Sequence, residues 1–189
     1  MKKLSAYLFL FLFGFSAPSF ADDIRDFQIE GMSVSDSMLD FLSEEKIKDN
    51  IQDFYKNNEF IPVWIEGSYF KSTMYEKIEF NYKNGDKNYV IYNVSGLTFP
   101  KNINDCYQKM DEIIESINNA VPNVNKSSKE TRNLKKDKSG NSKLTFVEFY
   151  FDSGRSQVGC YDWSIEKGWI DHLRVAIALD EFIDWSINN

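Results

Sequence analysis

The chain contains 189 residues with 29 acidic and 22 basic side chains, which gives a formal net charge of −7 at pH 7. This acidity disfavours general nucleic-acid binding, which depends on the neutralisation of phosphates. Aromatic residues make up 16% of the chain, and together with its Val, Ile and Leu content they exclude an intrinsically disordered protein.

Residues 1–21 have the three parts of a cleavable secretory signal peptide. Lys2 and Lys3 supply positive charge, residues 4–15 form an almost unbroken apolar run, and Ala21 ends the segment that a signal peptidase reads. An uncleaved anchor is the alternative, but the run is shorter than the roughly 20 residues that span a bilayer. Cleavage leaves residues 22–189, with 20 basic and 29 acidic side chains and a net charge of −9. We expect one extracytoplasmic domain with no stable membrane insertion.

The first part of this domain indicates short helices followed by an edge strand. Ser33 and Asp36 have the Ser-x-x-Asp spacing that caps a helix start. We expect two short amphipathic helices after them, at residues 38–42 and 43–55. The apolar run at 60–65 contains a proline, which favours an edge strand because proline cannot donate to an interior ladder.

The rest of the chain shows strand and helix patterns in turn. Polar and apolar residues alternate over 77–83 and, after Asn84-Gly85, over 89–94, which predicts a β-hairpin. An apolar stripe predicts a helix from Asn102 or Asn104 to about Asn119. Similar arguments predict three strands and a last helix, at 144–151, 156–162, 171–178 and 180–185. The chain thus predicts an α+β domain with a mainly antiparallel sheet of about five strands packed by two to four helices.

Residues 123–143 interrupt this pattern, because hydrophobic residues give way to Lys, Ser, Asn and Gly. The composition predicts a long, basic, flexible loop. A solvated linker explains it with no further assumption, and we favour that interpretation. The alternative is contact with anionic lipid headgroups or an acidic partner, since each Lys contributes about 1 kcal/mol at a charged surface.

The chain has two cysteines, Cys106 and Cys160, and export would place them where disulfides persist. One intramolecular pairing is available to them. It would close a loop of about 55 residues, for which chain entropy gives about 4 kcal/mol. Two separate buried thiols or a redox pair are the alternatives, although a redox pair lacks the C-x-x-C spacing.

His172 is the single histidine, so a metal site with two imidazoles is excluded. Oriented by Asp162 or Asp171, it could act as a general acid or base. We favour a solvent-facing strand residue instead, because alternation places His172 and Arg174 on the polar side of the last strand. No residue is predicted to be catalytic, to ligate a metal or to hold a cofactor; near the helix starts, Asp36 and its acidic neighbours lack the spacing of a calcium loop.

The densest mix of aromatic, acidic and imidazole groups lies near the last strand. If these side chains line a groove, ring faces could bind an apolar or sugar-like ligand while a carboxylate fixes its orientation. Packing at the edge of the core is the more ordinary interpretation. The candidate binding residues are Asp162, Trp163, Trp169, Asp171, His172 and Arg174.

Five stretches carry a resemblance to a known group: residues 29–37, 89–92, 105–107, 160–163 and 171–175. Together they resemble uncharacterised exported proteins of marine alphaproteobacteria. The resemblance implies a bacterial envelope location, periplasmic or secreted, and a pairing of Cys106 with Cys160, and it implies no activity. Residues 31–54 more weakly resemble the BamE (SmpA) type of envelope protein, which implies two short helices packed on an antiparallel sheet; the lipoprotein cysteine of that type is missing.

We therefore expect a non-catalytic binding or adaptor module of the cell envelope that works without a cofactor. Its partner would be an envelope protein or a small ligand. The alternative function is a small periplasmic hydrolase that uses Asp or Glu with His172. A pocket in which His172 meets Asp162 and Asp171 would favour the hydrolase, and an exposed aromatic groove or a free sheet edge would favour the module.

Overall fold

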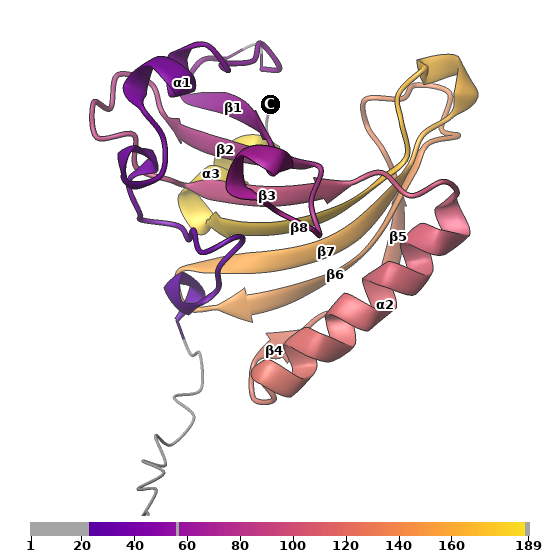
Figure 1. The fold of residues 1–189 in the computed structure, drawn as a ribbon. Helices are drawn as coiled ribbons and strands as arrows, with labels where there is room; N and C mark the ends of the chain where they lie inside the picture. The colour runs from indigo at the N-terminus through magenta and orange to yellow at the C-terminus, as the bar shows by residue number, and fades with distance from the viewer. Residues whose placement is uncertain (1–22, 56, 188–189) are drawn as a thin grey trace, which may run out of the picture.

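The computed structural model describes residues 23–55 and 57–187. The signal peptide predicted at residues 1–21 therefore lies outside the described residues. Within them the chain forms one antiparallel sheet of eight strands and three α-helices (Figure 1). The predicted α+β class with a mainly antiparallel sheet is confirmed. The expected number of about five strands is too low. The expected range of two to four helices is imprecise, and the described residues form three α-helices.

The sheet joins strands from both halves of the chain. Its hydrogen-bonded order is β1-β2-β3-β8-β7-β6-β4, and β5 also pairs with β6. The last strand, β8, thus lies between β3 and β7 near the middle of the sheet. The strands are β1 (Phe60–Glu66), β2 (Lys77–Lys83), β3 (Asn93–Thr98), β4 (Asn125–Lys126), β5 (Glu130–Asn133), β6 (Lys143–Phe151), β7 (Gly154–Asp162) and β8 (His172–Leu179).

The longest helix, α2 (Ile103–Ala120), packs on one face of the sheet, which we call the α2 face (Figure 1). Its apolar stripe was predicted, and Asn102 caps it by accepting a hydrogen bond from the Asp105 N–H at 3.0 Å. Cys106 and Met110 of this helix belong to the main core. That core also contains the N-terminal segment, which includes α1 (Glu44–Lys48) and two short 3-10 turns.

The third helix, α3 (Asp180–Ile187), lies behind the sheet in Figure 1 and packs on the other face, which we call the α3 face. Phe182 of α3 packs there with Phe60 of β1 and Ala178 of β8. Successive side chains of a strand point to opposite faces, so His172 and Arg174 share this face with Ala178. The polar face that alternation predicted for β8 is therefore not open, because α2 packs on one face of this strand and α3 on the other.

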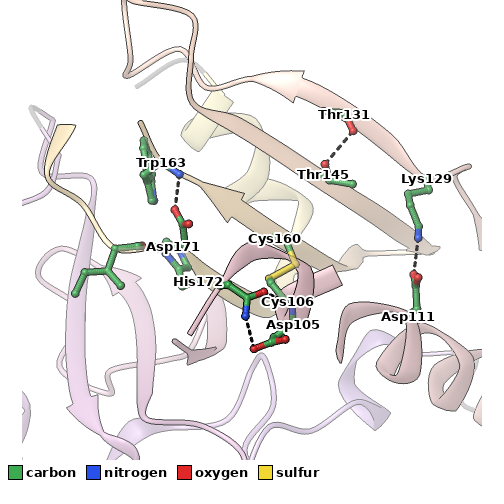
Figure 2. The surroundings of a disulfide bond; sticks show 12 residues. Asp105, Cys106, Asp111, Lys129, Thr131, Thr145, Cys160, Trp163, Asp171 and His172 are labelled. Carbon is green, nitrogen blue, oxygen red and sulfur yellow. Dashed lines mark hydrogen bonds and ion pairs between the residues drawn. A yellow bond between two sulfur atoms is a disulfide. The ribbon is translucent and has the colours of Figure 1, made fainter. Parts of the chain in front are cut away.

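Cys106 and Cys160 form a disulfide with a Cα–Cα distance of 6.0 Å (Figure 2). The predicted pairing is confirmed, and both alternatives are excluded. The bond joins the first turn of α2 to β7, and both residues are fully buried. It fixes the helix on the α2 face.

Residues 43–55 do not form one helix, and this prediction is wrong beyond α1. The chain leaves the helix after Lys48 and runs beside the edge strand β1, where the Gln52 N–H donates to the Pro62 carbonyl at 2.9 Å and the Trp64 N–H donates to the Asn50 carbonyl at 3.0 Å. The apolar spacing is compatible with a helix, but the edge of β1 offers backbone partners that an isolated helix end lacks. Residues 50–52 thereby cover the middle of that edge.

Ser33 and Asp36 form a hydrogen-bonded turn and do not cap a helix. The Asp36 carboxylate accepts a hydrogen bond from the Ser33 N–H at 2.8 Å. The 3-10 turn that follows at Met38–Asp40 is capped by Ser37 instead. The Ser-x-x-Asp spacing correctly indicated a bond from the Ser33 N–H to the Asp36 carboxylate, but the helix start expected there is absent.

The predicted hairpin exists, since β2 and β3 are adjacent and antiparallel, but its second strand begins at Asn93 instead of residue 89. Gly85 turns the chain with a φ of 81°. Residues 89–91 then pair with the N-terminal segment, where Met38 donates to the Tyr89 carbonyl at 3.0 Å. This pairing anchors the N-terminal segment to the sheet.

The segment predicted as a basic loop at residues 123–143 contains β4 and β5, so the expectation of a loop throughout is corrected. Both strands pair with β6, and the register slips by one residue between them, which indicates a β-bulge around residues 127–129. Lys129 reaches Asp111 of α2 at 2.5 Å. Exposed strands of this kind form through backbone bonds and need no apolar alternation, which explains why the composition did not predict them.

Candidate functional site

The candidate residues surround the loop that joins β7 to β8. Tyr161 and His172 are paired neighbours in these two strands, so residues 163–171 leave and re-enter the sheet at one place. The loop contains a 3-10 turn, Ile165–Lys167, which ends at Gly168 with a φ of 64°. A left-handed conformation of this kind favours glycine, and it reverses the chain toward β8.

Trp163, Trp169 and Asp171 come together at the base of this loop. The two indole rings meet edge to face with their centroids 4.4 Å apart. The Asp171 carboxylate accepts a hydrogen bond from the Trp163 backbone N–H at 2.7 Å (Figure 2). Asp171 therefore holds the two ends of the loop together and is not directed at His172.

Tyr161 joins this cluster on the α3 face, and it was missing from the sequence-predicted set. Its ring stacks on His172 with centroids 4.6 Å apart and an angle of 10° between the planes. On one side the ring centroid of Trp163 lies 6.1 Å from that of Tyr161, and on the other the centroid of Phe99 lies 5.9 Å from that of His172. Four rings thus form a row across the end of the sheet. The antiparallel pairing of β7 with β8, which the sequence analysis did not predict, places Tyr161 opposite His172.

His172 is a packed ring rather than the solvent-facing residue we expected. Its Nδ1 is 2.9 Å from the Ile170 carbonyl oxygen. Burial, reinforced by the positive charge of Arg174, lowers the pKa of His172 to about 4. The imidazole is therefore neutral at pH 7.

The three groups of the hydrolase alternative do not form a hydrogen-bonded unit in the described part of the chain. Asp171 bonds the Trp163 backbone. Asp162 lies two residues after Cys160 and so points to the α2 face, away from His172. Burial and the nearby Asp171 charge raise the pKa of the Asp162 carboxyl. Among residues 23–55 and 57–187, no carboxylate is hydrogen-bonded to the imidazole.

Protonation of His172 should destabilise the fold. Because its folded pKa of about 4 lies below its ordinary value of 6.5, the associated stability is fully present above pH 6.5 and is lost as the pH falls toward 4. At about pH 5 the loss amounts to about 2 kcal/mol. In urea unfolding at neutral pH and at about pH 5, wild type should lose that much more stability than His172→Phe, which keeps the stacked ring. Equal pH dependence of the two proteins would show that the imidazole is solvated.

Arg174 has a buried partner that the sequence did not reveal. Its Nη2 donates to Glu79 Oε2 at 2.6 Å, and Trp64 Nε1 donates to the same oxygen at 2.7 Å. The Glu79 side chain is 3% exposed. Burial by itself would lower the pKa of Arg174, but the Glu79 charge outweighs it and the pKa is raised. Arg174 was expected on an open face, and this expectation is corrected, because the ion pair holds the guanidinium against the sheet.

A second cluster fixes the loop to the segment before β6. The Asp137 carboxylate accepts hydrogen bonds from the hydroxyls of Ser139, Ser142 and Ser164, at 2.9, 2.6 and 2.9 Å. These bonds, with that from Ser142 the strongest, hold the pKa of Asp137 well below its usual range. Asp137 thereby joins residues 137–142 to the β7–β8 loop.

The two joined loops border a shallow hollow of about 300 Å³. Its lining is charged and polar, and it comes from both loops: Lys136, Asp137, Lys138, Ser139, Glu166 and Lys167. A second shallow hollow, of about 360 Å³, lies at the β1 edge between Gln52 and Pro62. Neither hollow includes one of the six candidate residues.

The β7–β8 loop exposes three large apolar side chains. Ile165 is 99% exposed, Ile170 is 67% exposed and Trp169 is 49% exposed. Lys167 lies 5.3 Å from the centre of the Trp169 ring. We call Ile165, Trp169 and Ile170 the apolar tip. Large apolar side chains that gather on a surface indicate an interaction site.

Metal binding and membrane spanning have no candidates in residues 23–55 and 57–187. No group of three or more His, Cys, Asp or Glu residues there could hold a metal ion. Asp36 bonds the Ser33 backbone, and Glu44 is engaged by Lys48 and Tyr89. No helix in these residues is both long and apolar enough to cross a bilayer.

Comparison with protein-family models, curated proteins and solved structures found no match to this chain.

Proposed function

We propose that this protein is an exported, non-catalytic binding or adaptor module of the bacterial cell envelope, and that it contacts its partner through the β7–β8 loop. The observation that carries the proposal is the apolar tip. Ile165, Trp169 and Ile170 are exposed on a loop whose base is fixed by hydrogen bonds and ring contacts. Rigid presentation of apolar side chains lowers the entropic cost of binding.

Two features support the extracytoplasmic location in this proposal. The signal-peptide pattern of residues 1–21 predicts export, and the disulfide requires an oxidising compartment to persist. The mature charge of −9 fits a protein that remains soluble in such a compartment.

The six candidate residues have different parts in this proposal. Trp169 makes the contact, while Trp163 and Asp171 shape the loop. His172 and Arg174 support it from the α3 face through the ring row and the Glu79 ion pair. Asp162 lies on the other face and does not contribute to the contact surface.

The module is tested by photo-crosslinking of the tagged protein in native envelopes, with proteins and lipids identified separately. Wild type should be crosslinked to an envelope component that Ile165→Ser/Trp169→Ser fails to capture. The matched control is Ile187→Ser, which removes an isoleucine that is 59% exposed on α3, far from the loop in sequence. Equal capture by all three proteins would refute the proposed contact surface, and turnover of a substrate that requires His172 would refute the non-catalytic assignment.

A further inference from the structure

The apolar tip has basic neighbours. Residues 126–143 contain seven basic and two acidic side chains, although the mature chain carries a net charge of −9. The Ser164 hydroxyl of the β7–β8 loop donates a hydrogen bond to Asp137 of this segment, so the two loops are joined. Lys136 and Lys138 line the hollow together with Lys167 of the β7–β8 loop. Both loops project together at the upper right of Figure 1, and Lys136 lies 5.9 Å from the centre of the Tyr55 ring.

The acidic groups in this surface do not cancel its positive charge. Asp137 already accepts hydrogen bonds from three serine hydroxyls and is 7% exposed. Glu166 is the remaining acid among the residues that line the hollow. Lys135, Lys136 and Lys138 are exposed around it. The exposed positive charge is thus concentrated beside the apolar tip.

The shape of the tip favours a fluid partner. Ile165 is almost fully exposed on a turn, and neither of the two hollows described above is lined by Ile165, Trp169 or Ile170. A bilayer interface accepts protruding Ile and Trp side chains without a matching pocket. Lysines beside such a protrusion would face the phosphates of anionic headgroups.

We propose that the two loops form a peripheral docking surface for a membrane that carries anionic lipid headgroups. In this arrangement Ile165, Trp169 and Ile170 enter the headgroup region, and Lys136, Lys138 and Lys167 contact phosphates. This inference rests on the proposed function, because it assigns a partner to the same tip. It also gives the basic segment a role that a solvated linker does not have.

The test is co-sedimentation of the mature, oxidised protein with vesicles of phosphatidylcholine alone or mixed with phosphatidylglycerol. Binding should require phosphatidylglycerol and fall as salt is added, because the lysine contribution is screened. Ile165→Ser/Ile170→Ser should weaken binding at least tenfold, and Lys136→Gln/Lys138→Gln should weaken it several-fold and reduce its salt dependence.

Two control variants keep the result specific. Ile187→Ser removes an exposed isoleucine elsewhere, and Lys87→Gln/Lys101→Gln removes two exposed lysines elsewhere. Both should bind as wild type does, and thermal unfolding should show that every variant is folded. If wild type does not bind the mixed vesicles, or if the controls lose as much binding as the tip variants, the membrane inference is overturned. Loss of vesicle binding together with tip-dependent crosslinking to a protein would overturn the membrane partner and leave the proposed module intact.

Discussion

Replacing Glu79 with Ala should lower the free energy of unfolding by about 3 to 5 kcal/mol, because it leaves the Arg174 guanidinium buried without its counter-charge. The same change removes the acceptor of the Trp64 indole N–H. Arg174 retains 23% side-chain exposure, which lets water reach part of the guanidinium and favours the lower end of the range. Urea unfolding of the oxidised protein measures the effect.

The matched control is Glu66→Ala on the adjacent strand. Glu66 pairs with Lys77 at 3.3 Å, but its side chain is 69% exposed, so the loss should be no more than about 1 kcal/mol. The double variant Glu79→Met/Arg174→Met should recover much of the stability lost in Glu79→Ala, because it leaves no unpaired charge and places apolar groups of similar size in the site. Equal losses in the two single variants would show that the Glu79 pair is solvated and contributes little.

Glu79 also shows where the sequence pattern stopped being informative. Alternation correctly divided β2 into two faces, with Ile78 and Phe80 on the α2 face. It did not show that the polar face is also covered. Asn81 and Glu79 on that face are both buried. Polar residues on alternate positions indicate a solvated face only when nothing packs on that face. The partner of Glu79 is 95 residues away in the chain, so local periodicity could not identify it.

The elements that were predicted well are those whose local signals agree with their tertiary contacts. The β6–β7 hairpin has apolar alternation on β6 and turn residues between its strands, and α2 has its cap, its stripe and a proline just after its end. The elements that were missed depend on distant backbone partners. Residues 50–52 bond to β1, and β4 and β5 bond to β6, in sequences that carry no strong strand pattern.

For the candidate site too, the sequence carried the local signals but not the exposure that the fold gives each residue. The density of aromatic and charged residues near β8 drew attention to the β7–β8 loop. It did not separate contact residues from supporting ones. Trp163 and Trp169 are the same residue type, but Trp169 is exposed and Trp163 is partly buried. Ile165 and Ile170 were missed because an isolated isoleucine is usually a core residue, and only the fold shows that these two remain uncovered.

Removal of the disulfide should destabilise the protein by about 4 kcal/mol, through the larger conformational freedom of the unfolded chain. The bond joins residues 54 positions apart, and the intervening chain includes most of α2, the basic segment and all of β6. Without it, the unfolded state gains the freedom of that whole segment. The measurement is urea unfolding of oxidised wild type against Cys106→Ala/Cys160→Ala.

Reduced wild type separates the cross-link from the packing of the sulfur atoms. Both cysteines are fully buried, so the alanine variant also loses some core contacts. Reduced wild type keeps those atoms, and we expect it to retain slightly more stability than the double variant while remaining well below the oxidised protein. Because Cys106 lies in the first turn of α2, amide exchange there should accelerate more than in the β6–β7 hairpin. A reduced protein as stable as the oxidised one would mean that the apolar stripe of α2 alone holds the helix on the sheet, and that the bond contributes no net stability.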